Sequence, residues 1–256
     1  MIHAQALVDP QADLTDSVEV GPFSVIGPQV SIGAGTVVGS HVIIEGRVRI
    51  GSNNRIYQFS SLGAEPQDKK FAGEDTCLEI GDDNTIREFC TFNRGTEDGG
   101  GTTRIGSDNW IMAYVHIAHD TRVGDHTIFA NAASLAGHTE VEDYVILGGF
   151  TLVHQYCRIG RHAFTSMGSN INRDVPPYVM VAGQMASPRG INTEGLKRRD
   201  FCADRVATIK QAYRILYKNG LQLNQAIEEL EQLAAAEPDV KPMVEFIRNS
   251  KRSIVR

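Results

Sequence analysis

The amino-acid sequence predicts a mainly β protein, with a solenoid of very short parallel strands over residues 1–188 and a helical domain over residues 189–256. Two observations predict the solenoid: aliphatic residues recur in steps of six, and a glycine often directly follows the aliphatic residue. The helical domain is predicted by a change to helical spacing beyond Pro177.

The six-residue period matches neither the 3.6-residue period of a helix nor the alternation of a plain strand, whereas it suits strands that stack from coil to coil. It slips at Thr165 and resumes at Ile171. The residues that keep it fall into three runs: Val8, Leu14, Val20, Ile26, Ile32, Val38, Ile44, Ile50, Ile56 and Leu62; Ile80, Ile86 and Phe92; and Ile105, Ile111, Ile117, Val123, Phe129, Leu135, Val141, Leu147, Val153 and Ile159.

This period resembles that of the hexapeptide-repeat proteins, which implies a left-handed parallel β-helix with three hexads in each triangular coil. Glycine tolerates positive φ and close backbone approach, so the glycines of segments such as IGAGTV and VGSHVI predict tight turns. Residues 63–79 and 93–104 lack aliphatic residues at the six-residue positions, and we expect them to leave the coil as loops. Long loops on a rigid scaffold commonly carry function, although a tolerated insertion is the alternative.

The C-terminal segment is predicted to contain three amphipathic helices. The first spans Phe201 to Lys218 and ends at Asn219-Gly220, and the others cover LQLNQAIEELEQLAAA and VKPMVEFIRNSK. Residues 189–256 hold 13 Lys/Arg against 9 Asp/Glu, a balance of +4, whereas residues 1–188 hold 12 against 22, a balance of −10. A local basic excess suits an acidic partner, and an ordinary solvated surface also produces it.

Several classes of protein are excluded by composition. No apolar run is long enough for a transmembrane helix, and the N-terminus has no basic region followed by an apolar stretch, as a signal peptide would. The four cysteines form no CxxC pair, which favours free thiols in a reducing compartment. We therefore expect a cytoplasmic protein with no transmembrane segment and no nucleic-acid partner.

Such a solenoid would bring together histidines that are far apart in the sequence, beginning with His119 of the segment HIAHD. Ile117, Leu135 and Val153 are 18 residues apart, so His119, His138 and His154 would lie near one edge of the prism, within about two strand spacings of ~4.8 Å. Scattered surface histidines are one alternative. A zinc site like that of hexapeptide-repeat carbonic anhydrases is another, but the spacings differ and no cysteine joins the cluster, so we expect no metal.

The motifs HIAHD, LAGH and VHQYC, with YQFSSLG, QDKKFAGE, GLKRR and DVPPYV, occur in this order over essentially the whole chain. Together they resemble the acyl-ACP:UDP-N-acetylglucosamine O-acyltransferases that start lipid A synthesis. The resemblance implies transfer of an R-3-hydroxyacyl group from acyl carrier protein to the 3-hydroxyl of UDP-N-acetylglucosamine. It implies no cofactor, and a homotrimer with active sites between subunits. The 3-amino analogue of the acceptor remains open.

The resemblance also assigns roles to individual residues. His119 is similar to the general base of the family, Asp120 would orient its ring, and the N–H of Gly137 would donate to the oxyanion. Arg198 and Arg199 suit a diphosphate or the acidic carrier protein, with a solvated charge run as the alternative. The remaining residues, implied to contact substrate, are Asp68, Lys70, His116, His138, His154 and Gln155.

Three positions depart from the family pattern. Asn93 stands where the family often has histidine, and Met185 follows Gly183-Gln184 where a GN pair is familiar. Met167 matches the position at which the family measures acyl length, and some members have glycine there. A methionine would shorten the acyl groove, so we expect donors of about ten to twelve carbons to be preferred over about fourteen, with Met185 as a second candidate.

The resemblance leaves two rivals. A non-catalytic scaffold would need neither the histidines nor the QDKK loop. The N-acyltransferase of the same pathway carries an extra N-terminal uridine-binding domain, whereas the hexads begin here by Val8, so we expect the O-acyltransferase.

Overall fold

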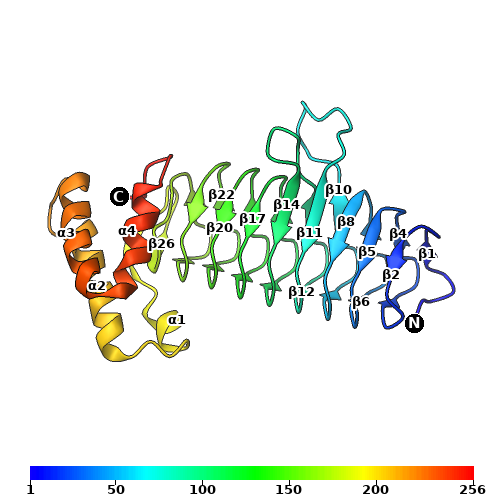
Figure 1. Ribbon diagram of the computed structural model, residues 1–256, viewed down its shortest axis with the longest axis horizontal. Coiled ribbons are helices and arrows are strands. Elements are labelled where there is room, and N and C mark those ends of the chain that lie inside the picture. Colours follow the sequence, from blue (N-terminus) through cyan, green and yellow to red (C-terminus); the bar gives the residue numbers. More distant parts are fainter.

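The computed structural model describes residues 1–256 as a long solenoid with helices at one end (Figure 1). Three parallel sheets form its sides, and strands that pair within a sheet are typically 18 residues apart, as Leu7 and Val25 are. The predicted solenoid of short parallel strands is therefore confirmed. The nine-stranded sheet contains β1 (Leu7–Val8), β4 (Val25–Ile26), β7 (Ile43–Ile44), β10 (Ser61–Ala64), β13 (Thr91–Asn93), β16 (His116–Ile117), β19 (Ser134–Leu135), β22 (Leu152–Val153) and β25 (Asn170–Ile171).

The other two sheets follow the same order along the solenoid axis. The eight-stranded sheet contains β2 (Asp13–Leu14), β5 (Val30–Ile32), β8 (Arg47–Ile50), β11 (Cys77–Ile80), β14 (Thr102–Ile105), β17 (Arg122–Val123), β20 (Glu140–Val141) and β23 (Arg158–Ile159). The ten-stranded sheet contains β3 (Glu19–Val20), β6 (Val37–Val38), β9 (Arg55–Ile56), β12 (Thr85–Ile86), β15 (Trp110–Ile111), β18 (Ile128–Phe129), β21 (Ile146–Leu147), β24 (Phe164–Thr165), β26 (Val179–Ala182) and β27 (Ser187–Ile191).

The residues of the six-residue period form the core. From Val20 onward each is buried, and only Val8 and Leu14 of the first coil are partly exposed. The threonine that interrupts the aliphatic pattern at position 165 does not interrupt the coil, because β24 pairs in register with β21 on one side and β26 on the other. The buried Thr165 hydroxyl has hydrogen-bond partners. It lies 2.7 Å from the Thr151 hydroxyl and accepts a hydrogen bond from the Gly148 N–H at 3.0 Å.

Most glycines that directly follow the inward aliphatic residue serve close approach between coils, whereas positive φ is found at others, such as Gly35 (φ 71°) in IGAGTV. A Cβ on Gly33 would lie 2.7 Å from the backbone of Gly51, and neither residue has positive φ. The left-handed conformation falls two residues later, for example at Asn53 (φ 57°). At many corners of the prism it is taken by aromatic residues or histidine, whose rings stack from coil to coil, as Phe59 and Phe89 do with centroids 5.1 Å apart.

The prism has three corners, which we name by the sheets that meet there. The first corner joins the ten- and nine-stranded sheets and carries Phe59 and Phe89. The second joins the nine- and eight-stranded sheets and carries Asp120. The third joins the eight- and ten-stranded sheets and carries His162.

His162 is a buried neutral histidine at the third corner. It is 7% exposed, its Nδ1 has no hydrogen-bond partner, and its ring stacks between Tyr144 and Tyr178. Burial, reinforced by nearby arginines such as Arg199, lowers the pKa of His162 to about 4. The unfolded chain, with a pKa of about 6.5 at this side chain, takes up the proton first. The stabilisation is therefore complete above about pH 6.5 and is lost as the pH falls toward 4, by up to about 3 kcal/mol.

We expect His162→Phe, which preserves the aromatic stack, to reduce the acid sensitivity of the fold. The wild-type midpoint of thermal unfolding should fall more between about pH 7 and about pH 4.5 than that of the variant. The exposed His3, replaced by alanine, is the matched control and should leave the acid sensitivity unchanged. Equal pH dependence of wild type and His162→Phe would contradict the assignment.

Two loops leave the solenoid at the second corner (Figure 1, top). They span residues 65–76 and 94–101 and are shorter than predicted, because their flanking residues continue the strand ladders. Cys77 pairs with Thr102, for example, and Ala64 pairs with Asn93. The coils resume beyond each loop, so the loops are additions to an unbroken core.

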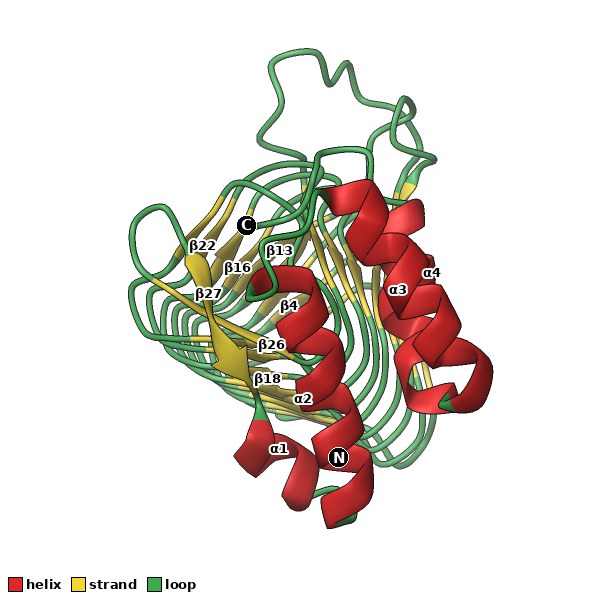
Figure 2. Cartoon of the chain, turned by 90° about the vertical axis from the view of Figure 1, so that its left-hand side faces the viewer, coloured by secondary structure: helices red, strands yellow, loops and turns green.

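Helices cover the C-terminal end of the solenoid (Figure 2). Strand β27 turns back antiparallel to β26, extending strand structure to Ile191, three residues past the predicted boundary at 188. The helices are α1 (Thr193–Lys197), α2 (Ala203–Tyr217), α3 (Leu223–Ala236), the 3₁₀ turn η1 (Pro238–Val240) and α4 (Lys241–Arg248). The last residues return to the solenoid, where Ile254 bridges Asp174. None of the helices combines the length and apolar character that a membrane crossing needs.

Candidate active site

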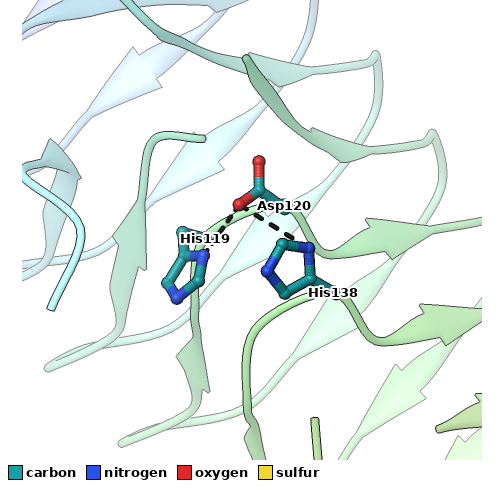
Figure 3. A group of neighbouring side chains, drawn as sticks. All are labelled: His119, Asp120 and His138. Carbon is teal, nitrogen blue, oxygen red and sulfur yellow. Dashed lines mark hydrogen bonds and ion pairs between the residues drawn. The ribbon is translucent and has the colours of Figure 1, made fainter. Parts of the chain in front are cut away.

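His119, Asp120 and His138 meet at the second corner, from two successive coils (Figure 3). Nδ1 of His119 lies 2.7 Å from Oδ2 of Asp120, and Nδ1 of His138 lies 3.8 Å from the same oxygen. The two imidazole rings are perpendicular, with centroids 5.1 Å apart. The coil stacking therefore brings together two of the three predicted histidines and the predicted carboxylate.

The Asp120 carboxylate is buried, with 1% of its side chain exposed, and is held by charge-stabilising hydrogen bonds. Thr96, from the second loop, donates its backbone N–H to Oδ1 at 2.9 Å and its hydroxyl to Oδ2 at 2.6 Å. Burial by itself would raise the pKa of Asp120, but the bonds from His119 and Thr96 outweigh it and hold that pKa below its usual value. The group is therefore an ionised carboxylate at neutral pH.

An ionised Asp120 fixes the tautomer of His119. Because a carboxylate only accepts, Nδ1 of His119 must carry the proton of their 2.7 Å bond. Nε2 is then the basic nitrogen of the ring. This pair has the form of a general base and its orienting carboxylate. The atoms with which His119, Asp120 and His138 could bind a metal ion lie within 4.8 Å of one another. The oxygens of Asp120, however, are already used to accept three hydrogen bonds from the protein.

Gly137 lies against the ring of His119. A Cβ on Gly137 would be 2.6 Å from Cε1 and 2.7 Å from Nε2 of that ring, so only glycine lets the imidazole occupy its place. The N–H of Gly137 donates to no acceptor of the chain, whereas its C=O accepts from Tyr156. A residue in contact with the His119 ring thus has an N–H free to donate to a ligand.

Two further histidines of the site have depressed basicity. Burial lowers the pKa of His116, whose Nδ1 lies 2.8 Å from the Thr91 hydroxyl. Burial also lowers the pKa of His138, against the opposing effect of Asp120. The ring of His138 stacks on Tyr156, with centroids 4.5 Å apart. Both histidines are therefore suited to hydrogen bonding as neutral rings.

Comparison with known proteins identifies the family. A model described as bacterial transferase hexapeptide matches residues 102–137, and one described as UDP N-acetylglucosamine O-acyltransferase, domain 2, matches residues 174–255. The acyl-[acyl-carrier-protein]–UDP-N-acetylglucosamine O-acyltransferases of Thiobacillus denitrificans and Halorhodospira halophila are 57% and 59% identical to this chain, and each match covers 100% of the chain and 99% of the relative. The chain belongs to this O-acyltransferase family.

Solved structures of family members agree. The UDP-N-acetylglucosamine acyltransferase of Francisella novicida superposes with a TM-score of 0.98 at 43% identity, over 100% of this chain and 94% of that one. The O-acyltransferase of Moraxella catarrhalis gives 0.97 at 45% identity, over 100% and 99%. These matches confirm the predicted left-handed parallel β-helix with C-terminal helices.

The first loop brings two predicted residues of this O-acyltransferase to the rim of the site. Asp68 and Lys70, with the second-loop residue Thr96, line a small cavity of about 60 Å³ between the loops. The Asp68 carboxylate is near enough to act on the pKa of His138. It also accepts a bond from the backbone N–H of Lys70 at 3.0 Å, which shapes the loop.

Other predicted residues are not gathered around His119 within one chain. His154 and Gln155 are exposed, and Nδ1 of His154 lies 3.2 Å from the carbonyl of Gln155. Arg199 lies over the ring of Tyr144, 4.8 Å from its centroid, and so belongs to the third corner. The remaining three, Arg198, Met167 and Met185, are exposed, and the two methionines are 78% and 67% exposed.

Residues that sequence reasoning missed complete the surroundings. The most important is Thr96, in the segment NRGT; this segment breaks the six-residue period and matches the family pattern apart from Asn93, but neither signal pointed to the threonine itself. Tyr156 and His138 line a cavity of about 540 Å³ together with Lys251 and Arg252 of the C-terminal segment. Asn93, the departure from the family pattern, is buried and donates to the Glu65 carbonyl at 2.8 Å, so it anchors the first loop.

Proposed function

We propose that this chain transfers an R-3-hydroxyacyl group from acyl carrier protein to the 3-hydroxyl of UDP-N-acetylglucosamine, as the first step of lipid A synthesis in the cytoplasm. The names of its relatives specify an acyl carrier protein donor and this nucleotide sugar as acceptor. The observation that carries the proposal is the bond of His119 to the ionised, buried Asp120, which leaves Nε2 free to act as a base.

The reaction follows from this geometry. Nε2 of His119 takes the proton of the acceptor hydroxyl as its oxygen attacks the thioester carbon, and Asp120 stabilises the imidazolium that forms. The N–H of Gly137 donates to the oxyanion of the tetrahedral intermediate. When the carbon–sulfur bond breaks, the leaving thiolate takes the proton back from His119. An ester and a free carrier thiol result, and no cofactor is needed.

Substrate contacts are assigned to the polar side chains around this pair. His116, His138, His154 and Gln155 would bind the sugar and nucleotide along the second corner. Asp68 and Lys70 would contact substrate from the first loop. The support for these contacts is the location of the residues. The ring of His138 lies against that of His119, and the Asp68 carboxylate is close enough to influence the pKa of His138.

The proposed reaction is tested with purified full-length protein, 3-hydroxyacyl carrier proteins of several chain lengths and UDP-N-acetylglucosamine. The expected product is the 3-O-acyl nucleotide sugar, identified by mass spectrometry. Transfer only to the 3-amino analogue would change the acceptor, and no transfer from any donor to either acceptor would overturn the proposal.

We further propose a homotrimer with active sites between subunits. Phe59, Phe89 and Tyr114 stack on one another along the first corner and are 49%, 41% and 59% exposed on the isolated chain, and contiguous exposed apolar surface usually marks an interaction surface. Arg198 and Arg199 lie at or near the third corner, so they would reach a diphosphate bound near His119 only from a neighbouring copy. Sedimentation equilibrium should give the mass of three chains, and a fully active monomer would contradict the arrangement.

Met167 is proposed to limit the length of the acyl chain, with Met185 as a second contributor. Met167 follows β24 at the first corner, across the nine-stranded sheet from His119, and the exposed Leu152 lies on the outer face between them. An acyl chain that begins at the base and crosses this face would meet the Met167 side chain at the far edge.

We expect Met167→Gly to move the donor preference toward longer chains. Each buried CH₂ contributes about 0.8 kcal/mol, so opening space for two should raise the ratio of kcat/KM for fourteen- over ten-carbon donors by more than about tenfold. Met185→Gly, measured in parallel, separates its contribution. Equal turnover of both donors by the wild type would count against a length limit at either methionine.

A further inference from the structure

We propose that Thr96 is a positioning residue for the general base, acting through Asp120 and attaching the second loop to the catalytic pair. This inference rests on the proposed function. It assigns a role to a loop segment for which the six-residue pattern of the solenoid gives no reason.

The contacts of Thr96 are concentrated on one carboxylate. Its N–H and hydroxyl reach both oxygens of Asp120, at 2.9 and 2.6 Å, and its side chain is almost fully buried. Oδ2 therefore accepts from the Thr96 hydroxyl and from Nδ1 of His119 at the same time. Thr96 is the only residue outside the solenoid coils that bonds this carboxylate.

The backbone around Thr96 is shaped to deliver these two bonds. The Thr96 carbonyl accepts from the N–H of Gly99 at 3.1 Å and of Gly101 at 2.8 Å, closing a tight loop. A Cβ on Gly99 would lie 2.0 Å from Cγ of Asp120, and one on Gly95 would lie 2.9 Å from Oδ1. The loop backbone thus lies directly against the carboxylate and keeps it from solvent.

The chemical consequence concerns the basicity of the pair. Donors to the charged form lower the pKa of a carboxylate, so removing the Thr96 hydroxyl raises the pKa of Asp120. A more basic Asp120 binds the imidazolium of His119 more tightly and so raises the pKa of the base. Protonation of Asp120 itself would release the ring. Both effects move the acid limb of the pH–rate profile to higher pH.

The test compares Thr96→Val, which keeps the shape but removes the O–H donor, with Thr96→Ser, which restores it. We expect Thr96→Val to lower kcat on the order of ten- to a hundredfold, because a less firmly held Asp120 lets the His119 ring leave its productive position, with little change in KM for the nucleotide sugar. The apparent pKa of the acid limb of kcat/KM should rise by about half a unit to one unit. Thr96→Ser should recover most of both.

Thr15→Val, the same substitution at an exposed threonine of the first coil, is the matched control and should behave as wild type. A merely structural role would lower the midpoint of thermal unfolding without moving the pH profile, and that result would overturn the inference. So would wild-type kcat and pH dependence in Thr96→Val, or an equal loss in Thr96→Ser. Because the wild type is assayed alongside, failure of the proposed function itself would appear separately, as an absence of transfer in every protein.

Discussion

Replacing His119 with alanine should lower kcat for acyl transfer by about 10²- to 10⁴-fold, the contribution that a positioned general base typically makes. Nδ1 of His119 is committed to the buried Asp120, and no other ring at the second corner has a bond this short to a carboxylate. The measurement is single-turnover transfer from 3-hydroxyacyl carrier protein to UDP-N-acetylglucosamine, so that product release does not mask the chemical step.

The control is His3→Ala, which removes an exposed histidine far along the sequence from the site and should leave kcat unchanged. Circular dichroism of both variants establishes that the fold is intact. If His119→Ala retains more than about a tenth of the wild-type kcat, the proton must leave by another route and the assignment of the base is wrong.

Gly137→Ala should reduce kcat on the order of 10²-fold, because a displacement of about 1 Å at a reacting group has this effect. The added methyl group would be 2.6 Å from Cε1 of His119, well inside contact distance, so the ring must move and lose its 2.7 Å bond to Asp120. The N–H of residue 137 remains, so the loss measures displacement of the base rather than removal of the oxyanion donor.

Gly27→Ala is the matched control for this substitution. Gly27 follows a strand of the same nine-stranded sheet, and a Cβ there would be 3.5 Å from its nearest neighbour, which is ordinary contact. We expect wild-type kinetics from it. Wild-type kcat in Gly137→Ala would show that the corner relaxes around the methyl group and that glycine is not needed to place His119.

The fold was predictable because each coil repeats one simple requirement, an inward aliphatic residue at every sixth position. The same spacing placed His119 and His138 in adjacent coils, which the structure confirms by the 5.1 Å between their rings. His154 follows β22 at the same corner in the next coil, as the counting predicted, but its side chain is exposed rather than in contact with Asp120. The position of Arg199 could not be predicted. It lies in the C-terminal segment that folds back onto the solenoid, and that segment does not follow the six-residue period.

The loops were the least predictable part of the site. Their existence followed from the missing aliphatic residues, but the contact of Thr96 with Asp120 depends on backbone turns at Gly99 and Gly101 that no periodic pattern encodes. The role of the repeated glycines was likewise only half predicted. Both positive φ and close approach were plausible at Gly33, and the structure selects close approach.

The two ends of the solenoid stop its sheets from growing by different means. Helices and the antiparallel β27 close one end, whereas β1 and β2 at the other have no strand on their outer side. An open end of this kind can pair with the open end of a second chain. The first coil carries Asp13, Asp16 and Glu19 on its exposed surface, so two such ends would meet with like charges opposed. High salt or acid removes that repulsion, and two chains would then associate through their N-terminal ends and stop at a pair, because the other end of each chain is closed.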